Sequence, residues 1–171
     1  MITQTAEAGD ARSLLVQMHQ TIDTLFDAWR RAQPGNNELV QRKLFLALEL
    51  RCKIEELVVL PVLGDATADR QATRRRYQRD IERLRALVDH AREHGISHAL
   101  RQHLIATLEG VTALHFSGVE CLLADAGHAP RIDSEELGRE IQAWLKRWHD
   151  EIDATGDIED EEMDPVGLPP R

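Results

Sequence analysis

The sequence predicts an all-α protein: an antiparallel, up-down-up-down four-helix bundle followed by one further amphipathic helix. Three observations support this prediction. Residues that favour helix, such as Ala, Leu, Glu and Arg, are abundant, whereas aromatic residues make up only 4% of the 171 residues. Apolar residues recur at spacings of three and four along five segments. Short breaks separate these segments, as expected for antiparallel neighbouring helices.

The first two helices are expected over residues 10–32 and 37–61, because the break Pro34-Gly35-Asn36 separates two apolar stripes. Asn37 suits the N-cap of the second helix, and Pro61 is expected to end it. The first stripe holds one histidine and comprises Leu15, Met18, His19, Ile22, Phe26 and Trp29. The second stripe holds two charged residues and comprises Leu44, Leu48, Arg51, Glu55 and Val58.

The third helix is expected to begin near Thr67 or Asp69 and to reach about His94, and the fourth is expected over residues 97–126, with Gly95 as the stop between them and Ser97 as an N-cap. The third stripe has Gln78 at its edge and comprises Tyr77, Ile81, Leu84, Val88 and Ala91. The fourth stripe again contains a histidine and comprises Leu104, Leu108, Val111, His115, Val119 and Leu122.

The first turns of the third helix are crowded with arginine. Positive charge at a helix N-terminus opposes the helix dipole. This crowding indicates either an acidic partner, for which the acidic C-terminal segment is one candidate, or simply a solvated basic face. The arginines concerned are Arg70, Arg74, Arg75, Arg76 and Arg79.

The fifth helix is expected from the N-cap Asp133, where Ile132 and Leu137 form a hydrophobic staple and Glu136 closes a capping box. Its stripe comprises Leu137, Ile141, Trp144, Trp148 and Ile152. The expected organisation is a flexible N-terminus, the bundle, the additional C-terminal helix and a disordered acidic tail. These parts span residues 1–10, 11–128, 129–153 and 154–171.

Charge and hydropathy exclude several classes of partner. The net charge is −9, and residues 150–171 carry nine acids and one base. An acidic segment of this kind argues against binding to nucleic acid. No apolar run approaches the roughly 20 residues that a membrane span needs. The polar N-terminus lacks the apolar core of a signal peptide, and two cysteines suit a reducing compartment, so a cytoplasmic protein is expected.

Polar residues interrupt the apolar stripes at one common height. Because a helix rises about 1.5 Å per residue, each interruption lies roughly two to three turns from the same end of the expected bundle. Buried polar groups are costly unless they are paired or bound to something, so a site inside the bundle is expected. The polar layer comprises His19, Arg51, Glu55, Gln78 and His115.

Each member of this layer also has a plainer interpretation. A lone histidine on an apolar stripe is most often a hydrogen-bonded core residue. Arg51 and Glu55 are one helical turn apart and form a ready internal ion pair. A single metal ion held by His19, Glu55 and His115, a set of two histidines and one carboxylate, is the alternative.

The second helix resembles a motif of hemerythrin-like (HHE) domains: a His, three residues, two Glu, an apolar run and a Pro. The matching stretch runs from Arg51 through Glu55 and Glu56 to Pro61. The segment 19–26 resembles the first histidine motif of that family, and 115–123 resembles the last motif. The resemblance covers residues 14–126.

The resemblance implies a four-helix bundle and, in family members, two irons held by His and carboxylate side chains. The corresponding positions here are His19, Arg51, Glu55, Gln78, His115 and Val119. Arg51 and Gln78 replace histidines, and Val119 replaces another ligand. Three remaining donors are too few for a di-iron centre, and Arg51 adds positive charge where cations would lie, so di-iron is not expected.

The cofactor is thus open, with none favoured over a single iron or zinc. The leading expectation is a regulatory, sensing or small-ligand-binding bundle in which Arg51 and Gln78 belong to a polar core layer. One alternative is a mononuclear metal protein in oxygen, nitric oxide or redox handling. Another is an interaction module, or homodimer, that uses Trp144 and Trp148. No phosphate loop, GxSxG or HExxH motif indicates an enzyme.

Overall fold

The computed structural model describes residues 10–32, 37–66, 69–126 and 133–155, and most of these residues are helical. The prediction of an all-α protein is confirmed, since no strand occurs within these ranges. The elements are α1 (Ala11–Arg31), α2 (Asn37–Ile54), a π-helical turn η1 (Glu55–Val59), α3 (Leu60–Ala66), α4 (Arg70–Arg92), α5 (His98–Ala126) and α6 (Ser134–Thr155).

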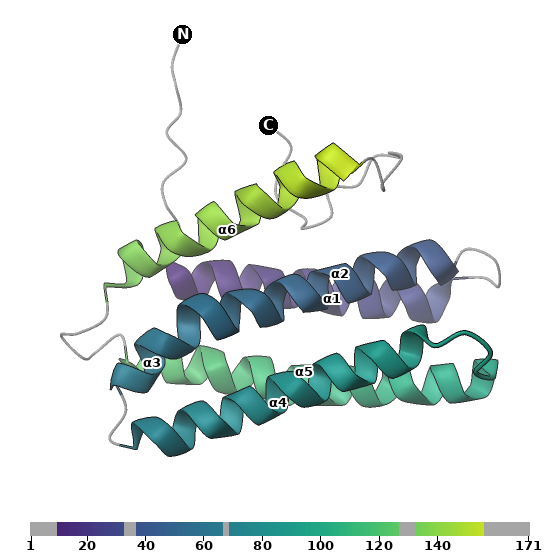
Figure 1. Cartoon of the computed structure of the whole chain (residues 1–171), viewed down its shortest axis with the longest axis horizontal. Coiled ribbons are helices and arrows are strands. Elements are labelled where there is room, and N and C mark those ends of the chain that lie inside the picture. The colour runs from purple at the N-terminus through teal and green to yellow at the C-terminus, as the bar shows by residue number, and fades with distance from the viewer. Residues whose placement is uncertain (1–9, 33–36, 67–68, 127–132, 156–171) are drawn as a thin grey trace, which may run out of the picture.

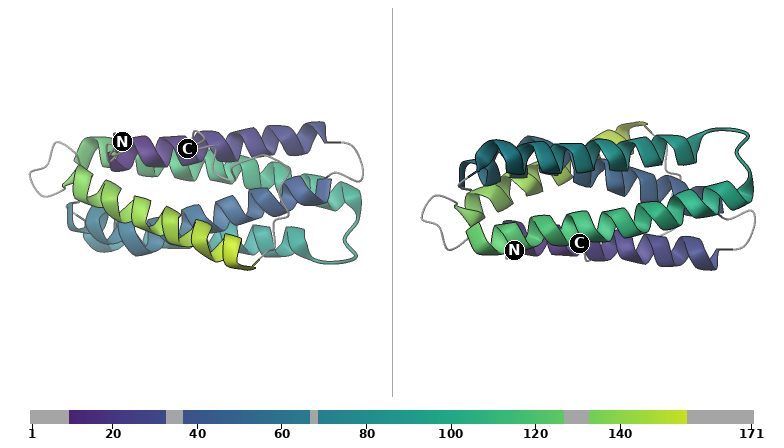
Figure 2. Two further views of the ribbon diagram at one scale, coloured as in Figure 1. Left: turned by 90° about the horizontal axis from the view of Figure 1, so that it is seen from above. Right: turned by 90° about the horizontal axis from the view of Figure 1, so that it is seen from below.

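The long helices lie side by side along one axis (Figure 1). Helix α1 packs against α2 and α5, and α4 packs against α5 and α3. Successive long helices run in opposite directions, as the two views from above and below also show (Figure 2), whereas α3 continues α2. Helix α6 crosses the other side of α1 and α2 and also contacts η1. Amphipathic stripes explain this arrangement, because each stripe is covered only when the helices face one another.

Side-chain caps fix where the helices begin. The Ser97 hydroxyl accepts the Leu100 N–H at 3.2 Å, and the Asp133 carboxylate accepts the Glu136 N–H at 3.0 Å. The predicted N-caps Ser97 and Asp133 are therefore confirmed, although Ile132 of the predicted staple lies outside the described residues. The prediction of Asn37 as an N-cap was wrong, because Asn37 lies within α2 and its Oδ1 accepts no hydrogen bond. Gly95, the predicted stop, adopts a φ of 89° in the turn between α4 and α5, a backbone conformation that favours glycine.

Pro61 does not end the second helix, which continues through η1 and α3 to Ala66. The prediction of a stop at this proline was wrong because a π-turn precedes it. The Leu60 N–H donates to the Glu55 carbonyl five residues back rather than four. A proline ring normally clashes with the carbonyl four residues before it, and the wider π-turn relieves that crowding.

The core is a single apolar cluster to which every long helix contributes. It includes Ile22 and Phe26 of α1, Phe45 of α2, Ile81 of α4 and Phe116 of α5, each at most 1% exposed. The fifth predicted helix joins this core and ends at Thr155, two residues beyond the expected boundary. The predicted flexible N-terminus and disordered tail lie outside the described residues, apart from their edges. None of the helices in the described ranges is long and apolar enough to span a bilayer.

Candidate functional site

The candidate site is centred on Glu55, the first residue of the π-turn. Its side chain is fully buried. A π-turn shifts the direction of the side chains that follow, and such turns are frequent at functional sites. Here the turn brings Glu55 to face α5 while Arg51, one turn earlier on α2, remains beside it.

Glu55 is held between two nitrogen donors. Arg51 Nε donates to Glu55 Oε1 at 2.6 Å, and His115 Nε2 lies 2.6 Å from Glu55 Oε2. Both oxygens of the carboxylate are thus engaged by side chains from α2 and α5. The contact between η1 and α5 therefore depends on charge-assisted hydrogen bonds rather than on apolar packing alone.

Arg51 is the largest fully buried side chain of the molecule's described part. Besides Glu55, it donates through Nη1 to the Leu15 carbonyl of α1. Its guanidinium carbon lies 4.5 Å from the centre of the Phe116 ring, a cation–π contact. Its Nη2 lies 3.7 Å from Glu120 Oε1 on α5. One arginine therefore ties α1, α2 and α5 together.

The remaining contacts extend the site in both directions to the surface. On one side, His19 Nδ1 lies 3.1 Å from Glu120 Oε1, and His19 Nε2 lies 3.8 Å from Asp23 Oδ2. On the other side, His115 Nδ1 lies 3.8 Å from Asp80 Oδ2 of α4. The side chains at the two ends are well exposed, at 59% for Asp23 and 39% for Asp80.

We call this series of contacts the ion-pair chain. It crosses the interior from α4 to α1 and ends in solvent on both sides. Its members, in spatial order, are Asp80, His115, Glu55, Arg51, Glu120, His19 and Asp23.

Two members of the ion-pair chain have shifted pKa values. Burial alone would raise the pKa of Glu55, but the charge of Arg51, together with the hydrogen bond and charge of His115, outweighs burial and lowers it. The hydrogen bond to Glu120 raises the pKa of His19 above 6.5, against the opposing effect of burial. The structure therefore favours an ionised Glu55 and a protonated His19.

The predicted polar layer is largely found, with one correction. Arg51, Glu55 and His115 contact one another directly, and His19 joins them through Glu120. Gln78 is instead exposed, so its placement in a buried layer was wrong. The position along the helix was predicted from the height of the layer, but each residue turns the side-chain direction by about 100°, so an error of one residue places the side chain on another face.

The inward position next to Gln78 belongs to Tyr77, whose ring lies 5.6 Å from that of His115. The polar layer predicted from the sequence also lacked Asp80 and Glu120, which the structure places in the site. Glu120, within the segment 115–123 that resembles the last hemerythrin-like motif, points towards His19 on α1. A search for carboxylates that flank each stripe, rather than lie on it, would have found both residues.

The donor set does not fit the two irons of the hemerythrin-like family. Within the described ranges, no three or more His, Cys, Asp or Glu side chains gather as a metal ion requires. The nitrogens of Arg51 and His115 occupy both oxygens of Glu55, and Arg51 places a fixed positive charge there. His19, Glu55 and His115 likewise do not converge on one point, because His19 faces Glu120.

Six buried side-chain polar atoms of the described residues lack hydrogen-bond partners, among them Arg51 Nη2, His115 Nδ1 and Thr112 Oγ1. A guanidinium N–H can only donate, so it suits an acceptor or an anion and not a cation.

Comparison of the chain with models of known protein families, with curated proteins and with solved structures gave no match. The resemblance to hemerythrin-like domains therefore stays a prediction.

Proposed function

We propose that the protein is a hemerythrin-like, up-down-up-down four-helix bundle that acts by binding, as a regulatory, sensing or small-ligand-binding protein of the cytoplasm. The observation that carries this proposal is the fully buried Arg51, bonded to Glu55 at 2.6 Å. An arginine in that position neutralises the carboxylate that a metal ion would need. Oxygen transport in the hemerythrin manner is therefore not the proposed activity.

The ion-pair chain supports a sensing role. Its end members, Asp23 and Asp80, are exposed, while its middle members are buried. A ligand or proton that acts at either end alters the charge facing His19 or His115, and through them the pairing of Glu55 and Arg51. Because an unpaired charge in the interior costs several kcal/mol, about 3–5 by analogy with broken buried pairs, small events at the surface bias the packing of the helices.

Metal analysis of the purified full-length protein tests the proposal. After growth in medium supplemented with iron and zinc, we expect far less than one metal ion per chain and no visible absorbance from iron. The alternative of a single iron or zinc held by His19, Glu55 and His115 requires one metal per chain. It also requires that Glu55→Ala and His115→Ala lose that metal. Stoichiometric iron that both variants lose would overturn the proposal.

A role in protein interaction is the second candidate, because two tryptophans of α6 are only partly buried. The guanidinium carbon of Arg147 lies 4.5 Å from the ring centre of Trp144, and Nζ of Lys53 lies 5.0 Å from the ring centre of Trp148. Aromatic side chains with adjacent cations are common at interfaces. Light scattering tests self-association: a monomer at all concentrations would exclude a homodimer through this helix.

A further inference from the structure

The bundle has two broad faces, and a helix covers only one of them. Helix α6 packs on α1, α2 and η1. On the opposite side, α4 and α5 lie next to each other, and no helix of the described ranges lies beyond them (Figure 1 and Figure 2). We call the outer surface of these two helices the α4–α5 face. Its side chains decide whether it is a solvated surface or a contact surface.

Helix α5 carries almost no charge on this face. Between Arg101 and Glu120 its only Asp, Glu, Lys or Arg is Glu109, which pairs with Arg30 of α1. Leu114 is 81% exposed, more than the other large hydrophobic side chains of the described residues. Absence of charge and exposed apolar side chains are typical of a contact surface. The exposed, uncharged residues concerned, which we call the α5 strip, are Leu100, His103, Ala106, Gly110, Leu114, Ser117 and Cys121.

Gly110 has a cost that its own chain does not explain. Glycine in the interior of a helix is about 1 kcal/mol less favourable than alanine. A Cβ atom at Gly110 would meet nothing within 4 Å, so no neighbour in the same chain requires glycine there. At Gly118, by contrast, a Cβ atom would lie 3.2 Å from the Tyr77 hydroxyl, and packing explains that glycine. The close approach of a second backbone would explain Gly110.

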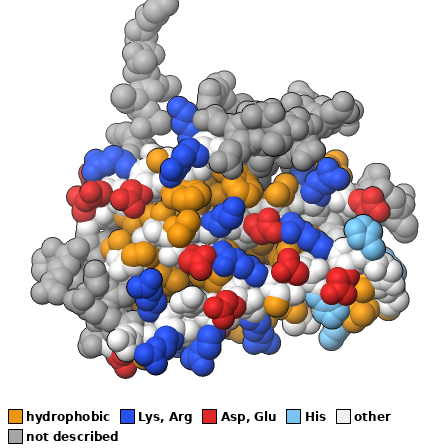
Figure 3. Space-filling model, viewed as in Figure 1, with side chains coloured by type: hydrophobic (Ala, Val, Ile, Leu, Met, Phe, Trp, Pro, Cys, Tyr) orange, Lys and Arg blue, Asp and Glu red, His pale blue; other side chains and the backbone are white. Residues whose placement is uncertain are grey.

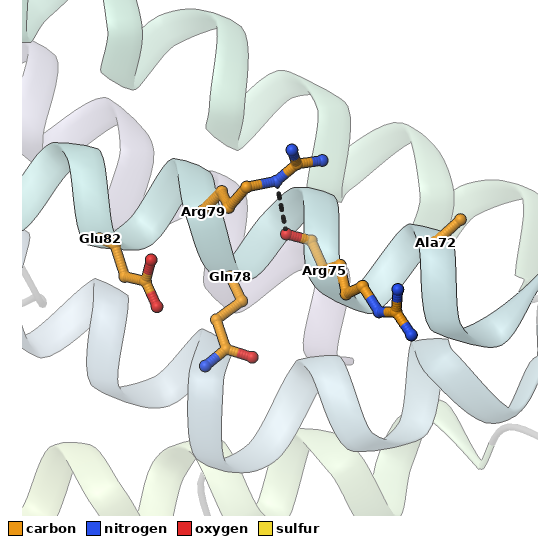
Figure 4. Close-up of a pocket in the computed structure, with 5 residues that line it drawn as sticks. All are labelled: Ala72, Arg75, Gln78, Arg79 and Glu82. Atoms are coloured by element: carbon orange, nitrogen blue, oxygen red, sulfur yellow. Dashed lines mark hydrogen bonds between the residues drawn. The ribbon is translucent and has the colours of Figure 1, made fainter.

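Helix α4 is basic near its start and exposes acids near its end. Its first turn contains no acidic residue, so positive charge gathers at the positive end of the helix dipole. Basic side chains lie along the lower edge of the molecule, where α4 runs (Figure 3), and Arg79 extends from the side of α4 opposite Gln78 (Figure 4). Towards its C-terminus, α4 exposes Asp89 and Glu93. Five exposed arginines form no ion pair with a carboxylate of the described residues: Arg74, Arg75, Arg76, Arg79 and Arg83.

Contacts between α4 and α5 show which of their residues lie at the same height. His115 lies beside Asp80, and Arg101 donates to the Glu93 carbonyl, so Gly110 lies level with about residue 85 of α4. A two-fold axis at this height, perpendicular to both helices, brings α5 onto a second α5 in antiparallel orientation.

This symmetry matches the side chains of the face to one another. Leu114 lies over the partner's Ala106, and the two copies of Gly110 meet at the axis. Arg79 faces position 91 of the partner's α4, between Asp89 and Glu93. One contact therefore places a protruding side chain over a small one and basic side chains opposite acidic ones, and a second copy of this chain supplies both.

We propose that two copies of the chain associate through the α4–α5 face in antiparallel orientation, with Gly110 at the two-fold axis. The α5 strip is about 32 Å long, and two helices each about 10 Å wide give roughly 640 Å² per copy. Specific interfaces bury about 800 Å² per partner, so this area suits a reversible dimer. An axis parallel to the helices is disfavoured, because it would bury the arginines of α4 under the uncharged α5 strip. The contact does not depend on the proposed binding function.

Sedimentation velocity of the full-length chain, from micromolar to millimolar concentration, tests the association. We expect the average mass to rise from one chain towards two. Leu114→Glu places a charge in the contact and should weaken association about tenfold or more. The control Leu39→Glu makes the same change at a leucine of α2 that is 54% exposed, and it should leave association unchanged. Circular dichroism checks that both variants are folded.

Three outcomes of this comparison overturn the proposal. One is a monomer at all these concentrations. Another is a dimer that Leu114→Glu leaves intact, which would place the contact elsewhere, such as on α6. The third is an equal loss of association in Leu114→Glu and Leu39→Glu.

Gly110→Gln separates the contact from the fold of the single chain. Because the space around Gly110 is open, the longer side chain should leave the helical content and the thermal midpoint of the monomer unchanged or raised. Association should again weaken about tenfold or more. A folded Gly110→Gln chain that associates as the parent chain does contradicts the proposal.

A disulfide cross-link tests the orientation. In a Cys121→Ser background, Gly110→Cys should form a disulfide-linked dimer under mild oxidation, since the two cysteines meet at the axis. The remaining native thiol, Cys52, is buried, and burial raises its pKa to about 12, so it does not compete. The control His103→Cys, in the same background, places the two cysteines about 21 Å apart along the helices, too far for a disulfide. Equal cross-linking of the two variants, or no cross-link in Gly110→Cys, overturns the antiparallel arrangement.

Discussion

Burial raises the pKa of Glu55 and nearby positive charge lowers it, and the charge of Arg51 is the main reason that the pKa is lowered. A carboxylate without a partner in the interior would become protonated. Arg51 and His115 together keep its pKa below the ordinary value. Hence the carboxylate contributes stability above its ordinary pKa, and this contribution is lost as the pH falls through the lowered one.

Removal of Arg51 alone should therefore be severe. We expect Arg51→Ala to lower the free energy of unfolding by about 3–5 kcal/mol, because Glu55 keeps its burial but loses its charge partner. Urea denaturation followed by circular dichroism measures this change. The control is Arg85→Ala, which breaks a half-exposed pair with Glu56 and should cost at most about 1 kcal/mol. Equal losses in the two variants would contradict the importance given to the buried pair.

His19 should report on the other end of the ion-pair chain. Its pKa is raised by the hydrogen bond to Glu120, so the contact stabilises the fold below the ordinary value of 6.5. That stabilisation is lost as the pH rises through the higher folded pKa. In an NMR titration, we expect the pKa of His19 to lie above 6.5 in the parent chain and to fall in Glu120→Gln. An unchanged His19 pKa in that variant would show that Glu120 does not stabilise the protonated form of His19.

At the scale of helices, the π-turn is the feature that aligns the site. It places one more residue between Arg51 and α3 than a continuous α-helix would accommodate, with the Leu60 N–H bonded to the Glu55 carbonyl. Leu57, within this turn, is 54% exposed, whereas Val59, Leu60 and Leu63 beyond it are buried. The π-turn thus absorbs the extra residue, and the side chains beyond it still face the core.

Deletion of Leu57 tests this account. Because the π-turn holds one residue more than an α-helical turn, the shortened segment can close as a regular α-helix in which Val59, Leu60 and Leu63 stay in the core. Pro61 then loses the widened turn, and its ring meets the carbonyl four residues before it, at a cost of about 3 kcal/mol in free energy of unfolding. The substitution Leu57→Ala keeps the residue count and the π-turn and should cost little, because Leu57 is 54% exposed. Thermal denaturation of both variants compares them, and a deletion variant as stable as Leu57→Ala would contradict the role of the turn.

The sequence predicted elements better than it predicted directions within them. Caps and breakers located the helix starts, since Ser97 and Asp133 act through local hydrogen bonds. The π-turn was not predicted, because the sequence around a proline does not show whether the preceding turn is widened or the helix ends. Heights along helices predicted the meeting of Arg51, Glu55 and His115, while the rotation error at Gln78 arose because helical phase drifts over a few residues.

At the scale of the whole molecule, α6 is part of the hydrophobic core and does not merely pack on the surface of the other helices. Leu137, Ile141 and Leu145 are at most 5% exposed and belong to the same apolar cluster as α1 and α2. Trp144 and Trp148 pack against the edge of that cluster. The sequence separated residues 129–153 from the bundle because no pattern within one helix reveals which neighbour covers its stripe.

Unfolding should therefore be a single cooperative event that includes α6. The substitution Trp29→Phe leaves Trp144 and Trp148 as the only tryptophans, so fluorescence then reports on α6 alone. Circular dichroism reports on all helices. Because α6 shares its buried side chains with α1 and α2, we expect the two signals to give the same urea midpoint and slope. In Ile141→Ala we expect the free energy of unfolding to fall by about 2–5 kcal/mol. Both signals should then show the same lower urea midpoint. A fluorescence transition at clearly lower urea than the helical one would show instead that α6 is a separate, weakly attached unit.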